Sequence, residues 1–270
     1  MLVVALAGCG GEDDDAAPTT SPEPTTTATT ATTEERTTLR AYFARGEQVG
    51  VSTREVERTS AVAAAALREL LAGPSAEERA AGLDTEIPAG TELRSVSIAG
   101  GTATVDLSRE FESGGGSASM TLRVAQVVHT LTQFPTVERV AFRLEGEPVE
   151  AIGGEGVVVS PPVDRVDFEA QAPAILVESV GPGDEVASPL RVTGTANTFE
   201  ATLNLRLVSE DGTVLHDDFA TATSGTGTRG TFDVTIEFDA EGPATLVAYE
   251  HSAEDGSEIN VVEIPVELRR

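Results

Sequence analysis

The sequence contains no lysine, no tryptophan and a single cysteine, and aromatic residues make up only 4% of its 270 residues. A lone thiol excludes any disulfide within the chain. Because large rings are scarce, the cores must be built mainly from Val, Ile, Leu and Ala. Positive charge is scarce too: 18 arginines stand against 45 acidic residues, for a formal net charge of -27. Such a surface argues against nucleic acid as a partner and against polybasic attraction to anionic lipids.

Long apolar runs are also missing, because no segment approaches the roughly 20 apolar residues that span a bilayer as a helix. A short apolar run opens the chain and ends in Leu6-Ala7-Gly8-Cys9. These four residues resemble a bacterial lipobox, in which the Cys receives a diacylglyceryl group and becomes the mature N-terminus. Two acyl chains hold a protein at a bilayer stably. We therefore expect residues 1–9 to be a lipoprotein signal, with lipidation (palmitate) at Cys9. The body would then be held at the extracytoplasmic face of the cell membrane by lipid alone.

The stretch after the cysteine, residues 10–35, has neither an aromatic nor a large aliphatic side chain and is rich in Thr, Ala, Pro and acids. It buries too little apolar surface to offset its ordering entropy, so it is predicted to be a disordered tether. This favours the lipoprotein interpretation over the alternative, an ordinary apolar N-terminus with a stray Cys9. Residues 1–8 lack the positive start of a usual signal peptide, so we expect the true signal to begin further upstream.

Periodicity then predicts an α+β domain over residues 36–152. Alternating apolar residues indicate a half-buried strand, and an Ala-rich stretch with an N-cap at Ser60 indicates a helix. Ser75 and Glu78 fit a capping box that opens a second, short helix. The predicted elements are a strand at 39–43, helices at 60–73 and 75–82, a hairpin at 92–108, a helix at 119–134 and a hairpin at 137–152.

Residues 153–172 are predicted to link this domain to a second one at 173–270, in which no helical period occurs. Short alternating runs separated by turn signals indicate strands there. They lie at 175–180, 190–195, 201–208, 214–220, 231–238, 244–250 and 258–268. About seven strands in about a hundred residues are typical of an all-β immunoglobulin-like sandwich. The Cys pair and Trp of antibody domains are absent, so aliphatic packing alone must form the core.

Several separated motifs in the first half follow one order. They are Ala41-Tyr42-Phe43, Leu70-Leu71-Ala72-Gly73-Pro74, Ile87-Pro88-Ala89-Gly90-Thr91, Ala103-Thr104-Val105-Asp106-Leu107-Ser108 and AQVVHTLTQFPTVERVAF at 125–142. Through them, residues from about 37 to 150 resemble the GerMN domain of sporulation and spore-germination lipoproteins.

A second set of motifs follows in the other half. It includes Pro182-Gly183-Asp184, Val192-Thr193-Gly194-Thr195-Ala196, Arg229-Gly230-Thr231-Phe232 and Asp255-Gly256-Ser257. Through these, residues from about 174 to 268 resemble the immunoglobulin-like domain that often follows GerMN. The resemblance implies an extracytoplasmic lipoprotein with a structural or binding role. It also implies assembly with like domains, either in other envelope proteins or in further copies of the chain.

The motifs of enzyme chemistry are missing from the sequence. His129, His216 and His251 lie far apart and lack the spacing of a zinc site. There is no GxSxG elbow or SxxK, and no GK[ST] follows the glycines at 114–116. We therefore expect no catalytic residue, no metal and no cofactor. An envelope hydrolase with paired carboxylates stays open as an alternative, because an acidic composition hides such a pair from counting.

Seven residues are candidates for partner binding: Asp106, Ser108, Gln126, Thr130, Gln133, Phe199 and Glu200. The first two follow a predicted strand, where such a pair more often ends the strand and caps the next turn. The next three form a polar stripe on the helix at 119–134, either as a solvated face or as a partner-binding face. The last two are expected to gather with Glu250 and Asp255 at one end of the sandwich.

These observations predict a lipid-anchored cell-envelope protein with a non-enzymatic structural or protein-binding role. The alternative is an extracytoplasmic receptor for a cell-wall glycan or another small ligand. An exposed aromatic platform would favour that alternative, but with no Trp and two Tyr the sequence offers little material for stacking on sugars.

Overall fold

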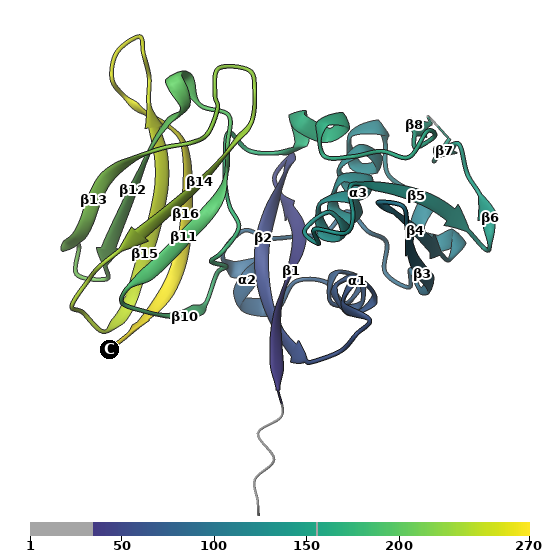
Figure 1. Cartoon of the computed structure of the whole chain (residues 1–270), viewed down its shortest axis with the longest axis horizontal. Helices are drawn as coiled ribbons and strands as arrows, with labels where there is room; N and C mark the ends of the chain where they lie inside the picture. The colour runs from purple at the N-terminus through teal and green to yellow at the C-terminus, as the bar shows by residue number, and fades with distance from the viewer. Residues whose placement is uncertain (1–34, 155) are drawn as a thin grey trace, which may run out of the picture. The chain divides into compact units, whose positions relative to one another are not determined.

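The computed structural model describes residues 35–154 and 156–270. Cys9, the predicted signal at 1–9 and the predicted tether up to residue 34 lie outside the described residues. The described residues form one compact unit (Figure 1). Among the described residues, no helix combines the length and the apolarity that a bilayer crossing requires.

The first half begins with a two-stranded antiparallel ribbon of β1 (Arg36–Arg45) and β2 (Gln48–Glu57). Helices α1 (Val62–Ala72) and α2 (Ala76–Ala80) follow. The next elements are β3 (Leu93–Ala99), β4 (Thr102–Leu107), the 3-10 turn η1 (Arg109–Glu112), α3 (Ser117–Leu131), β5 (Arg139–Leu144) and β6 (Glu147–Pro148). A four-stranded sheet has the order β3-β4-β5-β6, in which β4 and β5 run parallel.

Two details of this half differ from the sequence predictions. The stretch at 48–57 forms the strand β2, which was not predicted because Gly50 and the polar residues around it interrupt the apolar alternation. Gly50 serves packing, because a Cβ there would lie 2.6 Å from Leu83 Cδ2. The predicted N-cap at Ser60 is wrong, since α1 is preceded by Ala61 without a side-chain cap. The capping box of Ser75 and Glu78 is confirmed.

The core of the first half lies between the sheets and the helices. Tyr42 and Phe43 from β1 are fully buried, as are Leu67 from α1 and Val105 from β4. Every residue of α3 from Leu122 to Leu131 is buried. The central helix is therefore enclosed on its polar side as well, and Gln126 and Thr130 of the predicted polar stripe are buried.

The second half consists of two sheets around an aliphatic core. Its elements are β9 (Ile175–Val177), β10 (Asp184–Ala187), β11 (Leu190–Ala196), η3 (Phe199–Ala201), β12 (Thr202–Ser209), β13 (Val214–Thr221), β14 (Gly230–Ile236), β15 (Gly242–His251) and β16 (Glu258–Arg269). The sheet orders are β14-β11-β9 and β10-β16-β15-β12-β13. Each predicted run contains a strand. β10 is additional; it begins at Asp184 and pairs in parallel with β16.

The stretch predicted as a linker at 153–172 is largely packed against the first core. It contains β8 (Val157–Val158) and η2 (Val166–Gln171), and it follows β7 (Ala151–Ile152). Val163 and Phe168 belong to the first hydrophobic core, and so does Leu176 of β9, whereas its neighbours Ile175 and Val177 belong to the second. The same segment carries Arg165, whose guanidinium contacts Glu178 and the His129 carbonyl.

Candidate functional site

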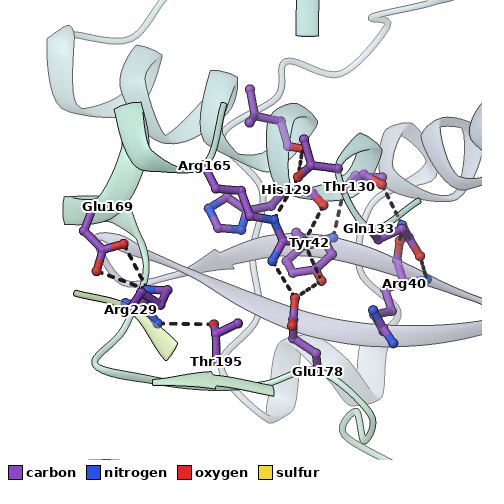
Figure 2. A network of polar contacts seen from close by, with 12 residues as sticks. Arg40, Tyr42, His129, Thr130, Gln133, Arg165, Glu169, Glu178, Thr195 and Arg229 are labelled. Carbon is purple, nitrogen blue, oxygen red and sulfur yellow. Dashed lines mark hydrogen bonds and ion pairs between the residues drawn. The ribbon is translucent and has the colours of Figure 1, made fainter. Parts of the chain in front are cut away.

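The polar stripe of α3 lies against the edge of β1. Thr130 Oγ1 accepts a hydrogen bond from the Tyr42 N–H at 3.1 Å, and Gln126 Nε2 donates to the Tyr42 carbonyl oxygen at 3.2 Å. Gln133 serves Arg40 in the same way: its Oε1 accepts from the Arg40 N–H at 2.9 Å, and its Nε2 donates to the Arg40 carbonyl at 2.7 Å. Figure 2 shows Thr130 and Gln133 facing this strand. The helix thus takes the place of a neighbouring strand.

This arrangement differs from both expectations for the stripe, a solvated face and a partner-binding face. Gln126 and Thr130 are completely buried, and their polar atoms satisfy backbone groups that an edge strand would otherwise leave open. A side-chain amide carries both a donor and an acceptor, as a peptide group does, so Gln133 pairs with Arg40 as a strand residue would. The three side chains are therefore engaged within the chain.

We expect the substitution Gln133→Ala to lower the free energy of unfolding by about 1 kcal/mol, because it leaves two backbone groups of a half-buried strand residue without protein partners. Urea unfolding followed by circular dichroism measures this. Gln48→Ala is the matched control, since that exposed amide makes a single contact of 3.4 Å, to the Ala172 carbonyl. Equal losses in the two variants would contradict the assigned role.

A buried polar network continues from the side chain of Tyr42 (Figure 2). The Tyr42 hydroxyl donates to Glu178 Oε1, which follows β9. Arg165, directly before η2, donates from Nη1 to the same carboxylate oxygen at 2.7 Å and from Nη2 to the Tyr42 hydroxyl oxygen at 3.1 Å. Its guanidinium carbon also lies 5.2 Å from the centroid of the Tyr42 ring. The network therefore ties β1 to the first strand of the second half.

The charges of this network are fixed by its own members. Burial acts to raise the pKa of Glu178, but the Arg165 charge and the hydrogen bonds outweigh it, so this pKa is lowered. Burial and then the Glu178 charge raise the pKa of the Tyr42 phenol. Burial acts to lower the pKa of Arg165, yet Tyr42 and Glu178 together raise it. At neutral pH, Arg165 and Glu178 form an ion pair and the Tyr42 phenol is neutral. This arrangement is suited to holding the two segments together rather than to proton transfer.

His129 completes the interior side of the network. Its ring lies 5.4 Å from the Tyr42 ring, and its carbonyl oxygen accepts a hydrogen bond from Arg165 Nη2 at 3.2 Å. Within the described residues, neither ring nitrogen has a hydrogen-bond partner. Burial, followed by the charges of Arg165 and Arg229, lowers the pKa of His129 well below its ordinary value. The ring is therefore a neutral core residue at physiological pH.

A second ion pair fastens η2 to the second half. Arg229 Nε donates to both carboxylate oxygens of Glu169, at 3.1 and 3.0 Å, and its Nη2 donates to the Pro173 carbonyl at 2.8 Å. Asn197 Nδ2 also donates to Glu169, at 3.0 Å. No pattern in the sequence predicts these contacts, because the partners lie far apart along the chain and each is a common surface residue type.

The other candidate residues lie elsewhere. Asp106, which is buried, accepts a hydrogen bond from the Gly146 N–H at 2.9 Å and so holds the β5–β6 turn. Ser108 Oγ accepts from the Glu92 N–H at 2.9 Å but makes no side-chain cap on η1. Ser108 follows the last residue of β4 and stands at the N-cap position of η1, and the contacts of both residues are local and structural.

Phe199 and Glu200 lie in η3. Of these two, Phe199 contacts Glu250, as predicted for this end of the sandwich. Its N–H donates to Glu250 Oε2 at 3.0 Å, and the residue is 54% exposed. Glu200 has a φ of 53° and donates its N–H to Thr226 Oγ1 at 3.0 Å. Asp255 instead organises the β15–β16 turn by accepting from the Ser257 N–H at 3.0 Å. Among the described residues, no group of three His, Cys, Asp or Glu side chains could hold a metal ion.

Comparison with known proteins agrees with this architecture. Residues 40–150 match the Germane family, described as sporulation and spore germination. Residues 174–257 match the Gmad2 family, described as the immunoglobulin-like domain of bacterial spore germination. The chain carries a GerMN-like domain followed by a spore-germination immunoglobulin-like domain. The predicted fold class, an α+β domain followed by an all-β sandwich, is confirmed.

Solved structures of similar proteins include the sporulation protein GerM from Bacillus subtilis. Its first GerMN domain is 27% identical, with a TM-score of 0.42, over 48% of this chain and 98% of that one. Its tandem GerMN domains are 18% identical, with a TM-score of 0.42, over 75% of this chain and 62% of that one. No curated protein matches the chain.

In these terms, the buried network of Tyr42, Arg165 and Glu178 connects the GerMN-like domain to the immunoglobulin-like domain. Two of its members belong to the matched segments 40–150 and 174–257, and Arg165 lies between them. The candidate site is therefore an internal fastening between two modules, and the outer surfaces of those modules are what a partner would meet.

Proposed function

We propose that this chain is a lipid-anchored cell-envelope protein whose two domains bind or organise protein partners outside the cytoplasmic membrane. The sequence Leu6-Ala7-Gly8-Cys9, followed by a polar Thr/Pro-rich stretch, is the observation that carries the anchor. A diacylglyceryl group on Cys9 would supply the two acyl chains that stable membrane binding requires. Residues 10–35 would then hold the folded domains away from the lipid head groups.

The non-enzymatic role is supported by the way the buried ionisable groups are used. Glu178, Arg165 and Tyr42 bond one another, and Glu78 bonds Arg54 and Ser52. Ionisable side chains in a catalytic cleft would instead converge on a space for substrate. The match to sporulation and germination domains favours a role in assembling proteins of the envelope. Partners would be other envelope proteins or further copies of the GerMN-like domain.

The anchor is tested with the full-length gene, including its natural signal, expressed in a bacterium that processes lipoproteins. We expect labelled palmitate to enter the wild-type protein and the protein to sediment with membranes. Cys9→Ser should abolish both, whereas Ser21→Ala in the predicted tether should change neither. Equal membrane recovery of wild type and Cys9→Ser would overturn the proposal.

A further inference from the structure

Strand β3, against which α1 packs and whose first residues are interrupted by a bulge at Arg94, lies at one end of the four-stranded sheet. It pairs with β4 on one side, and within the described residues no strand pairs with it on the other. Ser95, Ser97, Ile98 and Ala99 are all exposed, and Ile98 is 41% exposed although it is β-branched and apolar. In the described part of the chain, the five residues 95–99 make no hydrogen bond outside the β3–β4 pair. Backbone donors and acceptors therefore face solvent along this edge.

Edge strands usually carry a feature that prevents further pairing, such as charge or proline. In this chain β13 carries Asp217 and Asp218, and β10 carries Asp184 and Glu185. The segment 95–99 (SVSIA) has neither charge nor proline, although the chain has a net charge of -27. It is thus a place where two copies of this acidic chain could meet without opposing carboxylates.

The pattern of this segment is symmetric about Ser97. A small residue, a β-branched residue, a small residue, a β-branched residue and a small residue follow one another from Ser95 to Ala99. If two such strands pair antiparallel about Ser97, each Val96 lies opposite Ile98 of the other strand. Cross-strand pairs of β-branched side chains stabilise a sheet. They would cover the exposed Ile98 on the face that Ala103 and Val105 line within each copy.

We propose that β3 pairs antiparallel with β3 of a second copy of this chain, with Ser97 on the two-fold axis. The result is a continuous sheet with four strands from each copy. This inference rests on the proposed function, because it specifies the surface through which the GerMN-like domain self-associates. So short a ladder buries less than the area of about 1,200–2,000 Å² that is typical of stable complexes, so it is weak in dilute solution. Confinement of both copies to one membrane raises their effective concentration and favours the pair.

The first test uses the lipidated full chain in membranes, where acylation blocks the Cys9 thiol. Ser97→Cys places one free thiol per copy at the axis, so mild oxidation should yield a covalent dimer on denaturing gels. Thr221→Cys on β13 is the matched control, because Thr221 is also exposed but lies far from β3 in the sequence, and it should stay monomeric. A monomeric Ser97→Cys chain, or equal dimer from both variants, overturns the pairing.

The second test uses charge at the same position, with two differently tagged copies expressed together. Ser97→Glu in both copies, or Ser97→Arg in both, sets like charges opposite each other and should lower co-purification about five-fold. One copy of each should restore it. Unchanged co-purification in all combinations overturns the proposal. Palmitate labelling and membrane recovery are measured on the same samples, so loss of pairing in an anchored chain is distinguished from loss of the anchor itself.

Discussion

Replacing Arg165 with alanine is expected to lower the free energy of unfolding by about 3–5 kcal/mol. The substitution leaves the Glu178 carboxylate, whose side chain is 11% exposed, inside the protein without its cation. It also removes the donor to the Tyr42 hydroxyl and the donor to the His129 carbonyl. An uncompensated buried charge costs far more than the net value of the pair itself, which explains the size of the effect. Urea unfolding monitored by circular dichroism gives the number.

The matched control for this variant is Arg191→Ala. Arg191 forms an ion pair with Asp233, but the two side chains are 70% and 53% exposed. Solvent screens such a pair, so we expect a loss of no more than about 1 kcal/mol. If the two alanine variants were equally stable, the interior position of Arg165 would carry no energetic weight, and the fastening between the domains would have to lie elsewhere.

A second large effect concerns acid. In the native protein the pKa of His129 lies well below 6.5, whereas in the unfolded chain it returns to its ordinary value. Below pH 6.5 the unfolded state therefore binds a proton that the native state refuses, and stability falls as pH falls. One such group contributes a slope of at most about 1.4 kcal/mol per pH unit, so the loss between pH 6.5 and 5 has an upper limit of about 2 kcal/mol.

The variant His129→Leu should lack this contribution and resemble wild type in stability at pH 7.5, because the ring makes no hydrogen bond in the described structure. Urea midpoints at pH 7.5, 6.5, 5.5 and 5 measure the difference, and parallel curves would refute it. Glu178 acts in a lower window. Its native pKa is lowered, so its contribution is present above its ordinary pKa of 4.5 and is lost as pH falls below that value.

Local signals predicted most of the secondary structure. The capping box of Ser75 and Glu78, the hairpin predicted at 92–108 and the helix predicted at 119–134 each depend on neighbours in sequence. The strands of the sandwich followed from alternation and turn residues in the same way. β2 and β10 were not predicted, because glycine and charged residues interrupt their alternation of apolar and polar residues. Pairing with β1 and with β16 stabilises them as strands.

The candidate site was beyond the reach of such patterns. Tyr42 and Glu178 are separated by 136 positions, and Arg165 lay in a stretch that looked like a linker. The residues chosen from the sequence, among them Gln126 and Thr130, were polar positions on a recognised helix, and their burial depends on what packs against that helix. A buried polar helix face and a solvated polar helix face have the same sequence pattern. The edge of β1, which buries this face of α3, comes from a distant part of the chain.

The sequence alone determined the acidic charge, the order of the modules and the elements whose cause is local, because propensity, capping and turn chemistry act over a few residues. Tertiary structure alone decided which polar groups lie inside, which arginines meet carboxylates and which strand edge stays open. Those outcomes depend on segments that are distant in the chain and become neighbours only when the fold closes.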